Sequence, residues 1–188
     1  GMIPTNDLTL KDGGLIDAST FGRGDAGSVE INANNSIFID GESSNGFPSR
    51  ISSRVNLDGV GVAEGVRIKT GNLTVTNGGL IDASTNGQGD AGFVEITAKE
   101  DITIEGEGSG NPSEVASIVE SGKIGNAGDV TLRANNLTLT NKGVVNTSSL
   151  GQGEAGDIEI EADSLRVANE ANIKAVTQSA TNNSDNDA

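Results

Sequence analysis

Two acidic residues, Asp82 and Glu120, are the strongest candidates for chemistry in this chain. Each is the polar member of a short aliphatic–polar–small triplet. On neighbouring strands, two such carboxylates could act as the acid and base of a glycosidase, or hold a hard cation. The triplet recurs along the chain, and its polar members define one outward column: Asp17, Ser52, Asp82, Glu120, Asn146 and Lys174.

Repetition argues against catalysis in this column. Asp17 and Asp82 stand in near-identical repeats, whereas a catalytic pair is usually unique, and the chain has no His or Tyr to share a proton transfer. A solvated acidic face is therefore the favoured interpretation. A weak cation site, or a catalytic pair made by Asp82 and Glu120, stays open as an alternative.

Composition removes most other chemistry. The 188 residues include no Cys, His, Trp or Tyr, which excludes disulfides, Cys/His zinc sites and histidine-based triads. The net charge of -15 is the wrong sign for nucleic acid. No stretch approaches the roughly 20 apolar residues of a membrane span. We expect no enzyme activity, no cofactor, no nucleic-acid partner and no membrane insertion.

A glycine motif that could signal nucleotide binding has a structural explanation. Residues 22–27 match G-x-G-x-x-G, and residues 87–92 repeat the match. A dinucleotide site requires a helix after the glycines, but here a strand pattern follows each time. We interpret these glycines as turn residues with positive φ.

Two long insertions are the candidate binding loops. Asp40–Arg50 reads DGESSNGFPSR, and Glu105–Ala116 reads EGEGSGNPSEVA. Insertions on one face of a repeat array often form its binding face, although they can also simply cover a sheet edge. Phe47 is the residue most expected to make contact, since no strand pattern requires it. The full set of candidates is Ser44, Asn45, Phe47, Arg50, Asn111, Ser113 and Glu114.

Internal repeats predict the elements that would position these residues. Residues 13–33 and 78–98 are identical at 17 of 21 positions, and residues 142–162 are a diverged third copy. Apolar–polar–apolar triplets begin at positions 8, 37, 73, 102, 137 and 165, with spacings of 29, 36, 29, 35 and 28. This period indicates stacked supersecondary units.

Each unit contains short segments of period-two alternation bounded by Gly, Asn and Asp, a pattern typical of half-buried strands. We therefore predict an all-β fold: a right-handed parallel β-helix (solenoid) of about six coils, with three short parallel sheets and alternating short and long coils. The repeat alignment predicts an outward column in which Arg67 lies between Glu30 and Glu95. Opposite charges on neighbouring strands are favourable, which supports this register.

The repeat pattern LTL-x-x-GGLIDAST-x-G-x-G-DAG-x-VEI resembles the repeats of large bacterial exoproteins of the filamentous haemagglutinin type. The likeness extends over residues 7–176. It implies a right-handed β-helix, two-partner secretion, an extracellular or cell-surface location and adhesion. The secretion module of that family carries Asn-Pro-Asn motifs, whereas this chain has Asn111-Pro112-Ser113. The resemblance therefore indicates the repeat-containing shaft of such an exoprotein rather than its secretion module.

The predicted organisation has three parts: residues 1–6 as a cleavage scar and lead-in, residues 7–176 as one repeat domain, and residues 177–188 as a disordered polar tail. We expect a rigid, non-enzymatic shaft of a secreted adhesin that presents loops to cell-surface or extracellular glycans or proteins. End-to-end self-association through exposed end strands is a further expectation. The alternatives are a polysaccharide lyase or glycosidase, and a cation-dependent glycan-binding module.

Overall fold

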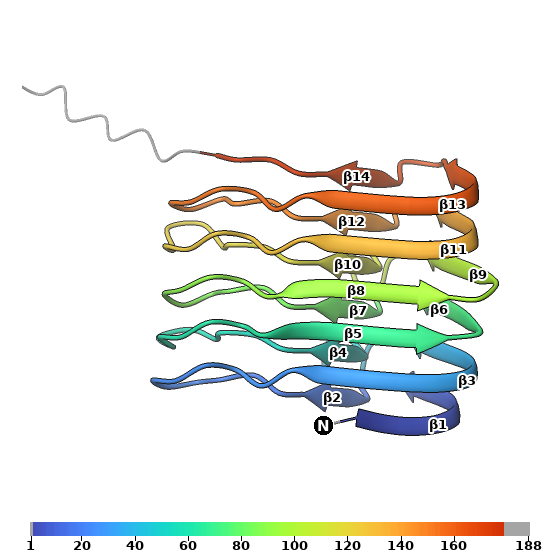
Figure 1. The fold of residues 1–188 in the computed structure, drawn as a ribbon, viewed down its shortest axis with the longest axis horizontal. Helices are drawn as coiled ribbons and strands as arrows, with labels where there is room; N and C mark the ends of the chain where they lie inside the picture. Colours follow the sequence, from blue (N-terminus) through green and yellow to red (C-terminus); the bar gives the residue numbers. More distant parts are fainter. Residues whose placement is uncertain (1, 179–188) are drawn as a thin grey trace, which may run out of the picture.

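The computed structural model describes residues 2–178, and every regular element in them is a strand. Successive segments of chain lie on top of one another (Figure 1), and we call each such segment a level. Sheet A contains β1 (Met2–Lys11), β3 (Val29–Asp40), β5 (Gly65–Thr70), β6 (Asn72–Thr76), β8 (Phe93–Ala98), β9 (Asp101–Glu105), β11 (Val130–Thr140) and β13 (Ile158–Val167). Sheet B contains β2 (Leu15–Asp17), β4 (Arg50–Ser52), β7 (Leu80–Asp82), β10 (Glu114–Ala116), β12 (Val144–Asn146) and β14 (Asn172–Lys174).

Strand pairing confirms the all-β prediction and corrects the predicted fold class. Strands β3, β5, β8, β11, β9 and β6 are hydrogen-bonded in a closed ring of six parallel strands. Strands β1 and β13 pair onto this ring, and sheet B lies apart. The hydrogen bonds thus define a closed six-strand parallel barrel plus a separate sheet. The prediction of a right-handed parallel β-helix with three sheets was wrong.

The ring closes because two strands are long enough to pair twice. Val29–Asn32 of β3 pairs with β5, whereas Ser36–Asp40 of the same strand pairs with β6. Strand β11 bridges β8 and β9 in the same way. We expected these halves to be separate strands, because Asn-rich segments such as Asn34–Asn35 look like turns in sequence. Here they continue the extended chain.

The predicted register along sheet A is confirmed. Glu30, Arg67 and Glu95 are in-register partners on β3, β5 and β8. Arg67 Nε lies 2.8 Å from Glu95 Oε2, and the Phe93 ring centroid is 4.9 Å from the Arg67 guanidinium carbon. Further along, Arg133 pairs with acidic residues on both neighbouring strands. At Arg67 and Arg133, charges of opposite sign therefore lie next to each other on the outer face of sheet A.

Inside, the opposite face of the same strands builds the core. Ile31, Ile68, Ile96 and Leu132 are in-register neighbours on β3, β5, β8 and β11, and all four are fully buried. Aliphatic columns of this kind form one continuous hydrophobic cluster from Leu10 to Val145. Each residue of a column is covered by its equivalents above and below it, so burial depends on stacking between levels.

Glycines form the corner between sheet B and the next strand of sheet A. Positive φ was predicted for all glycines of the repeated motif, and it is found only at the second glycine of each copy: Gly24, Gly89 and Gly153 have φ of 129°, 123° and 140°. A Cβ on Gly89 would overlap the carbonyl oxygen of Gly61 in the neighbouring level. Glycine is therefore required here by both backbone conformation and close contact between levels. We call this edge the glycine corner.

At the chain ends, Met2–Thr5 of β1 pairs in register with Glu30–Ala33 of β3. Most of the residues predicted to be a lead-in are thus part of the sheet. Thr177 forms a single bridge to Ser149. The rest of the predicted disordered tail, from residue 179 onward, lies outside the described residues.

Truncating one member of a buried column tests this description of the core. We expect Ile96→Ala to lower the free energy of unfolding by about 2–5 kcal/mol, because it removes methyl groups from a fully packed site. Urea denaturation measures the change. The exposed Val60→Ala variant is the control, with an expected change within about 0.5 kcal/mol. Equal effects of the two substitutions would contradict the assignment.

Candidate binding site at the first long loop

The first long loop, residues 41–49 between β3 and β4, is a small hairpin. Glu42 and Pro48 face each other in an antiparallel bridge. The Ser43 backbone N–H donates to the Phe47 carbonyl oxygen at 2.8 Å, and the Phe47 N–H donates back to the Ser43 hydroxyl at 3.1 Å. These contacts fix the backbone on both sides of Phe47.

This hairpin rests on the tight turn of the level below. The Ser49 hydroxyl donates to the Asp40 carbonyl oxygen at 2.8 Å and accepts the Gly13 N–H at 3.1 Å. Gly13 has a φ of 81°, and a Cβ added there would stand 2.8 Å from the Ser43 Cβ. A larger residue at position 13 would push the hairpin away, so the hairpin packs directly on Gly13.

Between the hairpin and sheet B lies a pocket of about 310 Å³. We call it the first-loop pocket. It brings together two of the residues predicted from sequence, Phe47 and Arg50. The other linings, which we did not predict, are Gly13, Leu15, Ser43 and Pro48. Phe47 and Leu15 are 67% and 51% exposed, so the pocket has apolar walls open to solvent. Ser44 and Asn45, also predicted candidates, are exposed at the tip of the hairpin and do not line it.

The Arg50 guanidinium is the one positive charge among the residues that line this pocket. Arg50 begins β4, between Leu15 and Leu80 of the adjacent strands, and is half-buried. Ion pairs within residues 2–178 use Arg54, Arg67, Arg133 and Lys142 and do not include Arg50. Arg50 thus presents a charge without a salt-bridge partner at an apolar pocket.

The second long loop, residues 106–113 between β9 and β10, has the same construction as the first long loop. Glu107 and Pro112 form the antiparallel bridge. Ser113 is fully buried; its hydroxyl donates to the Glu105 carbonyl oxygen at 2.6 Å and accepts the Gly78 N–H at 3.0 Å. Ser113 is therefore the equivalent of Ser49 and supports the loop, so its prediction as a binding residue was wrong.

Chemically, the two loops differ where ligand contact is expected. Asn111 takes the position before proline that Phe47 occupies in the first loop. Glu114 takes the position of Arg50, since both pair with Leu80 of β7. The second loop thus carries an amide and a carboxylate where the first carries an aromatic ring and a guanidinium. The predicted candidates Asn111 and Glu114 are present, but they do not form an equivalent site.

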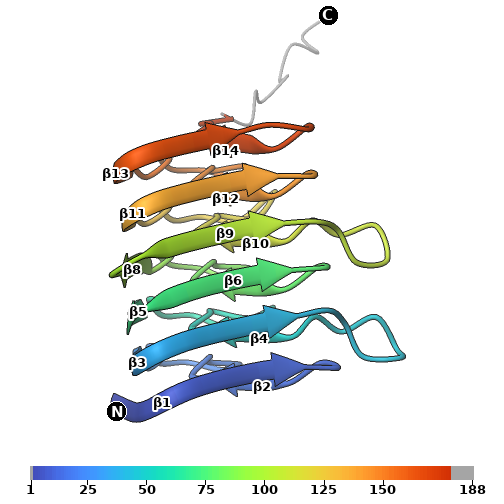
Figure 2. The same cartoon turned by 90° about the vertical axis from the view of Figure 1, so that its right-hand side faces the viewer.

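Both loops project from one edge, as Figure 2 shows, and Glu42 connects them. Its carboxylate accepts the Ser109 N–H at 3.0 Å and the Asn111 Nδ2–H at 3.4 Å. The hydrogen bond from the Ser109 backbone lowers the pKa of Glu42 below its ordinary value. This link across two levels braces the first loop from above and occupies Asn111.

The predicted carboxylate column is corrected at one position. In register with Asp82 on β7 stands Ala116 of β10, not Glu120. Val119 forms an isolated bridge beyond that strand, so Glu120 lies outside sheet B. The chain has two similar triplets here, 114–116 and 119–121, and the strand predicted from sequence was the second. Asp82 and Glu120 are therefore not a pair on adjacent strands.

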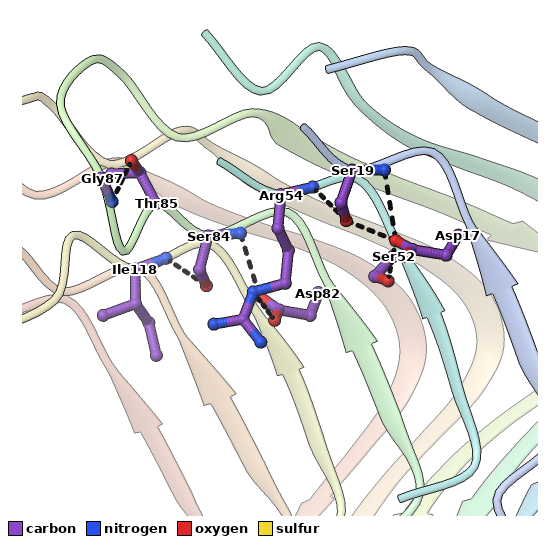
Figure 3. A network of polar contacts seen from close by, with 9 residues as sticks. All are labelled: Asp17, Ser19, Ser52, Arg54, Asp82, Ser84, Thr85, Gly87 and Ile118. Atoms are coloured by element: carbon purple, nitrogen blue, oxygen red, sulfur yellow. Dashed lines mark hydrogen bonds and ion pairs between the residues drawn. The ribbon is translucent and has the colours of Figure 1, made fainter. Parts of the chain in front are cut away.

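Asp82 itself has a structural role. It is only 3% exposed, although we predicted a solvated face. One oxygen accepts the Ser84 N–H at 2.9 Å, and the other lies 3.0 Å from Arg54 Nε (Figure 3). An aspartate that accepts the N–H two residues on stabilises a local turn. With the Arg54 charge beside one oxygen and the Ser84 N–H donating to the other, Asp82 acts as a turn cap.

Repeats of Asp-x-Ser extend this arrangement through the stack. Asp17 and Asn146 accept the N–H of Ser19 and Ser148 in the same way. The serine hydroxyls then accept a backbone N–H from the next level: Ser19 from Arg54, and Ser84 from Ile118 (Figure 3). The signal for this network was in the sequence, as the DAST motif, and its role is to join levels.

Burial raises the pKa of Glu114 above its ordinary value. The Asn146 amide opposes this shift by donating to Glu114 Oε1 at 3.1 Å, while the negative charges of Asp82 and Glu120 add to it. Glu114 is thus more easily protonated in the folded chain than in the unfolded one.

Within residues 2–178, no three His, Cys, Asp or Glu side chains are grouped as a metal site would require. The same residues contain no helix long and apolar enough to cross a membrane. Comparisons with protein-family models, curated proteins and solved structures gave no match to the chain. Function is therefore inferred from the geometry of the first-loop pocket and from the repeat pattern.

Removing the Asp82 side chain tests its structural role. We expect Asp82→Ala to cost about 2–4 kcal/mol of unfolding free energy, because it leaves the mostly buried Arg54 without its counter-charge and removes a turn cap. Its exposed repeat equivalent, Asp17→Ala, is the matched control, with an expected cost of about 1 kcal/mol. Chemical denaturation of both variants measures the difference. Equal costs would show that the Arg54 pair contributes nothing.

For Glu114, the raised pKa predicts a pH-dependent penalty. As pH rises above 4.5, the ordinary value, the unfolded chain loses this proton before the folded chain does, so stability falls. Glu114→Gln keeps the acceptor for Asn146 and removes the charge. We expect its melting temperature to rise by about 2–4 °C at pH 7 and to match the parent at pH 4. The exposed Glu64→Gln is the control, and a gain at both pH values would contradict the assignment.

Proposed function

We propose that this chain is a non-enzymatic binding segment of a secreted bacterial surface protein of the adhesin type. Its stacked levels act as a stiff support, and the first long loop makes contact with a cell-surface or extracellular partner. The resemblance of the repeats to filamentous haemagglutinin-type exoproteins supports the extracellular location and the adhesive role.

The observation that carries the proposal is the first-loop pocket. A binding site combines an apolar concave surface with a few polar groups that fix orientation, and this pocket has Phe47, Leu15 and Pro48 beside Arg50 and Ser43. Its hairpin is held by hydrogen bonds on both sides of Phe47 and by the hydrogen bond from the Gly13 N–H to the Ser49 hydroxyl. A pre-formed site of this kind binds without the entropic cost of ordering a flexible loop.

Neither alternative drawn from the sequence gains a specific observation. A polysaccharide lyase or glycosidase would have used Asp82 and Glu120, but these do not pair, and Asp82 is occupied by Ser84 and Arg54. The same arrangement removes the Asp82 and Glu120 column proposed as a weak cation site. A cation-dependent glycan-binding module would use the long loops, and within residues 2–178 no three acidic side chains are grouped there to hold a cation. The binding role is therefore the function that the geometry favours.

Replacing the loop tests the proposal. In the test variant, residues 41–49 are exchanged for the short turn that follows β6, and the control has the same exchange in residues 106–113. Both variants and the parent are applied to a broad panel of glycans and cell surfaces, with and without calcium. We expect binding by the parent and its loss in the test variant. The control loses the contacts of Ser109 and Asn111 with Glu42 but keeps the hydrogen bonds within the first loop and between Ser49 and Gly13, so it should still bind. Binding that survives removal of the first loop would overturn the assignment.

Self-association through the end strands is also expected. Among residues 2–178, strand β13 pairs on one side only, with β11, and its inward residues Leu165 and Val167 are largely exposed. In-register addition of β1 from a second copy would set Leu8 and Leu10 against them, and Lys174 of β14 against Asp17 of β2. Such head-to-tail contacts do not close, so they yield chains of molecules.

Sedimentation velocity over a range of concentrations measures this association. We expect the weight-average sedimentation coefficient to rise with concentration, and Leu165→Lys to suppress the rise by placing a charge in the contact. The matched control is Val60→Lys, which carries the same change on another exposed surface. A strict monomer at high concentration would exclude end-to-end pairing.

A further inference from the structure

We propose that the first-loop pocket binds a saccharide that carries a carboxylate, with the sugar ring against Phe47 and the carboxylate at Arg50. This inference rests on the proposed function, because it names the ligand of the same site. The chemistry is shared by uronic acids and sialic acids, and the experiment below separates the two sources.

The exposed ring of Phe47 is the first reason. The chain has four phenylalanines, and two of them are covered by cations: Phe38 lies 4.9 Å from Lys11 Nζ, and Phe93 lies 4.9 Å from the Arg67 guanidinium. Phe21 and Phe47 are the exposed pair, at 71% and 67%. Of these two, only Phe47 lines the first-loop pocket. Its ring offers a flat apolar face to the C–H face of a pyranose.

The free charge of Arg50 is the second reason. A planar guanidinium binds a carboxylate through two parallel hydrogen bonds, and no side chain within residues 2–178 forms an ion pair with Arg50. Asp17, on the adjacent strand β2, is near enough to interact electrostatically with Arg50. Its carboxylate instead accepts hydrogen bonds from Ser19 and Ser52. The guanidinium is therefore left for a ligand.

Selectivity follows from the surroundings. The chain carries a net charge of -15, so an anion meets general repulsion and gains only where a cation is exposed without a partner. The second loop shows the contrast, because Glu114 there would repel the same carboxylate. A neutral sugar would leave Arg50 unused, whereas an acidic sugar satisfies both the ring and the charge.

Pocket size favours a saccharide over an acidic peptide. A volume of about 310 Å³ lies at the small end of ligand sites, enough for one ring of a polymer. Strand β4, which carries Arg50, is paired on both sides, so an extended peptide could join sheet B only at the free edge of β2, on the side away from Arg50. We therefore commit to the saccharide, and an acidic peptide becomes an outcome of the test.

Isothermal titration calorimetry on the full chain tests the inference. The ligands are an oligogalacturonide, a sialyl-oligosaccharide, a neutral galactan oligosaccharide and a short polyglutamate peptide. We expect at least one acidic saccharide to bind about tenfold or more tightly than the neutral one, since one charged hydrogen-bonding contact distinguishes them. The affinity should also fall with added salt.

Variants assign this binding to the pocket. We expect Arg50→Gln and Phe47→Ala each to weaken the acidic saccharide about tenfold or more, with Arg50→Lys intermediate because it keeps the charge and loses the planar fork. The matched controls are Arg23→Gln and Phe21→Ala, which make the same changes at exposed positions in the first Gly-rich turn and should leave binding unchanged. Circular dichroism confirms that each variant is folded.

Four results would overturn the inference. Equal binding of neutral and acidic sugars would remove the role of the charge, and an Arg50→Gln variant that binds normally would remove this residue. Polyglutamate bound as tightly as the saccharides would reassign the pocket to an acidic protein partner. Loop-dependent attachment to cells without any saccharide binding would reject the inference while the proposed function stands. If attachment does not depend on the first loop, the proposed function fails as well.

Discussion

In-register backbone pairing between successive levels is the constraint on which the rest of the structure depends. Every strand pairing in both sheets is parallel, so equivalent residues of neighbouring levels stand about 4.8 Å apart. Each column must therefore be made of residues that interact favourably with the equivalent residues above and below them. Aliphatic residues such as Ile68 and Ile96 gain by stacking, like charges do not, and a turn can repeat only where its glycine lets the levels approach.

That constraint explains what the sequence could and could not predict of the fold. The column of Glu30, Arg67 and Glu95 was predictable, because register follows from a repeated pattern that keeps its spacing. Sheet boundaries were not. Whether Asn34–Asn35 ends a strand or continues it depends on the levels above and below, since β6 pairs with the second half of β3 there. Closure of the six-strand ring is therefore a property of the stack.

For the candidate site, residues whose role depends on local sequence could likewise be predicted, whereas residues whose role depends on neighbouring levels could not. Phe47 could be predicted because an aromatic residue in a polar loop has no role in the strand pattern. Leu15 and Gly13 could not, since they reach the pocket from the level below. The column that held Asp82 failed for a related reason: its counter-charge, Arg54, comes from another level, and the two triplets at 114–116 and 119–121 are alike in pattern. Ser113 was misjudged because its burial depends on a turn far away in sequence.

The glycine corner and the loop edge lie at different turns of each level, and they respond oppositely to change. At the corner, Gly61 and Gly89 touch across levels so closely that even one added carbon has no space. At the other edge, the chain passes from sheet A to sheet B through as few as three residues or as many as nine without altering the register on either side. Length thus varies only from 10 to 13 residues at the glycine corner, but threefold at the loop edge, from three residues to nine. New segments inserted there accumulate side by side on a single continuous surface, so a chain of this kind can diversify what it contacts while its support stays the same.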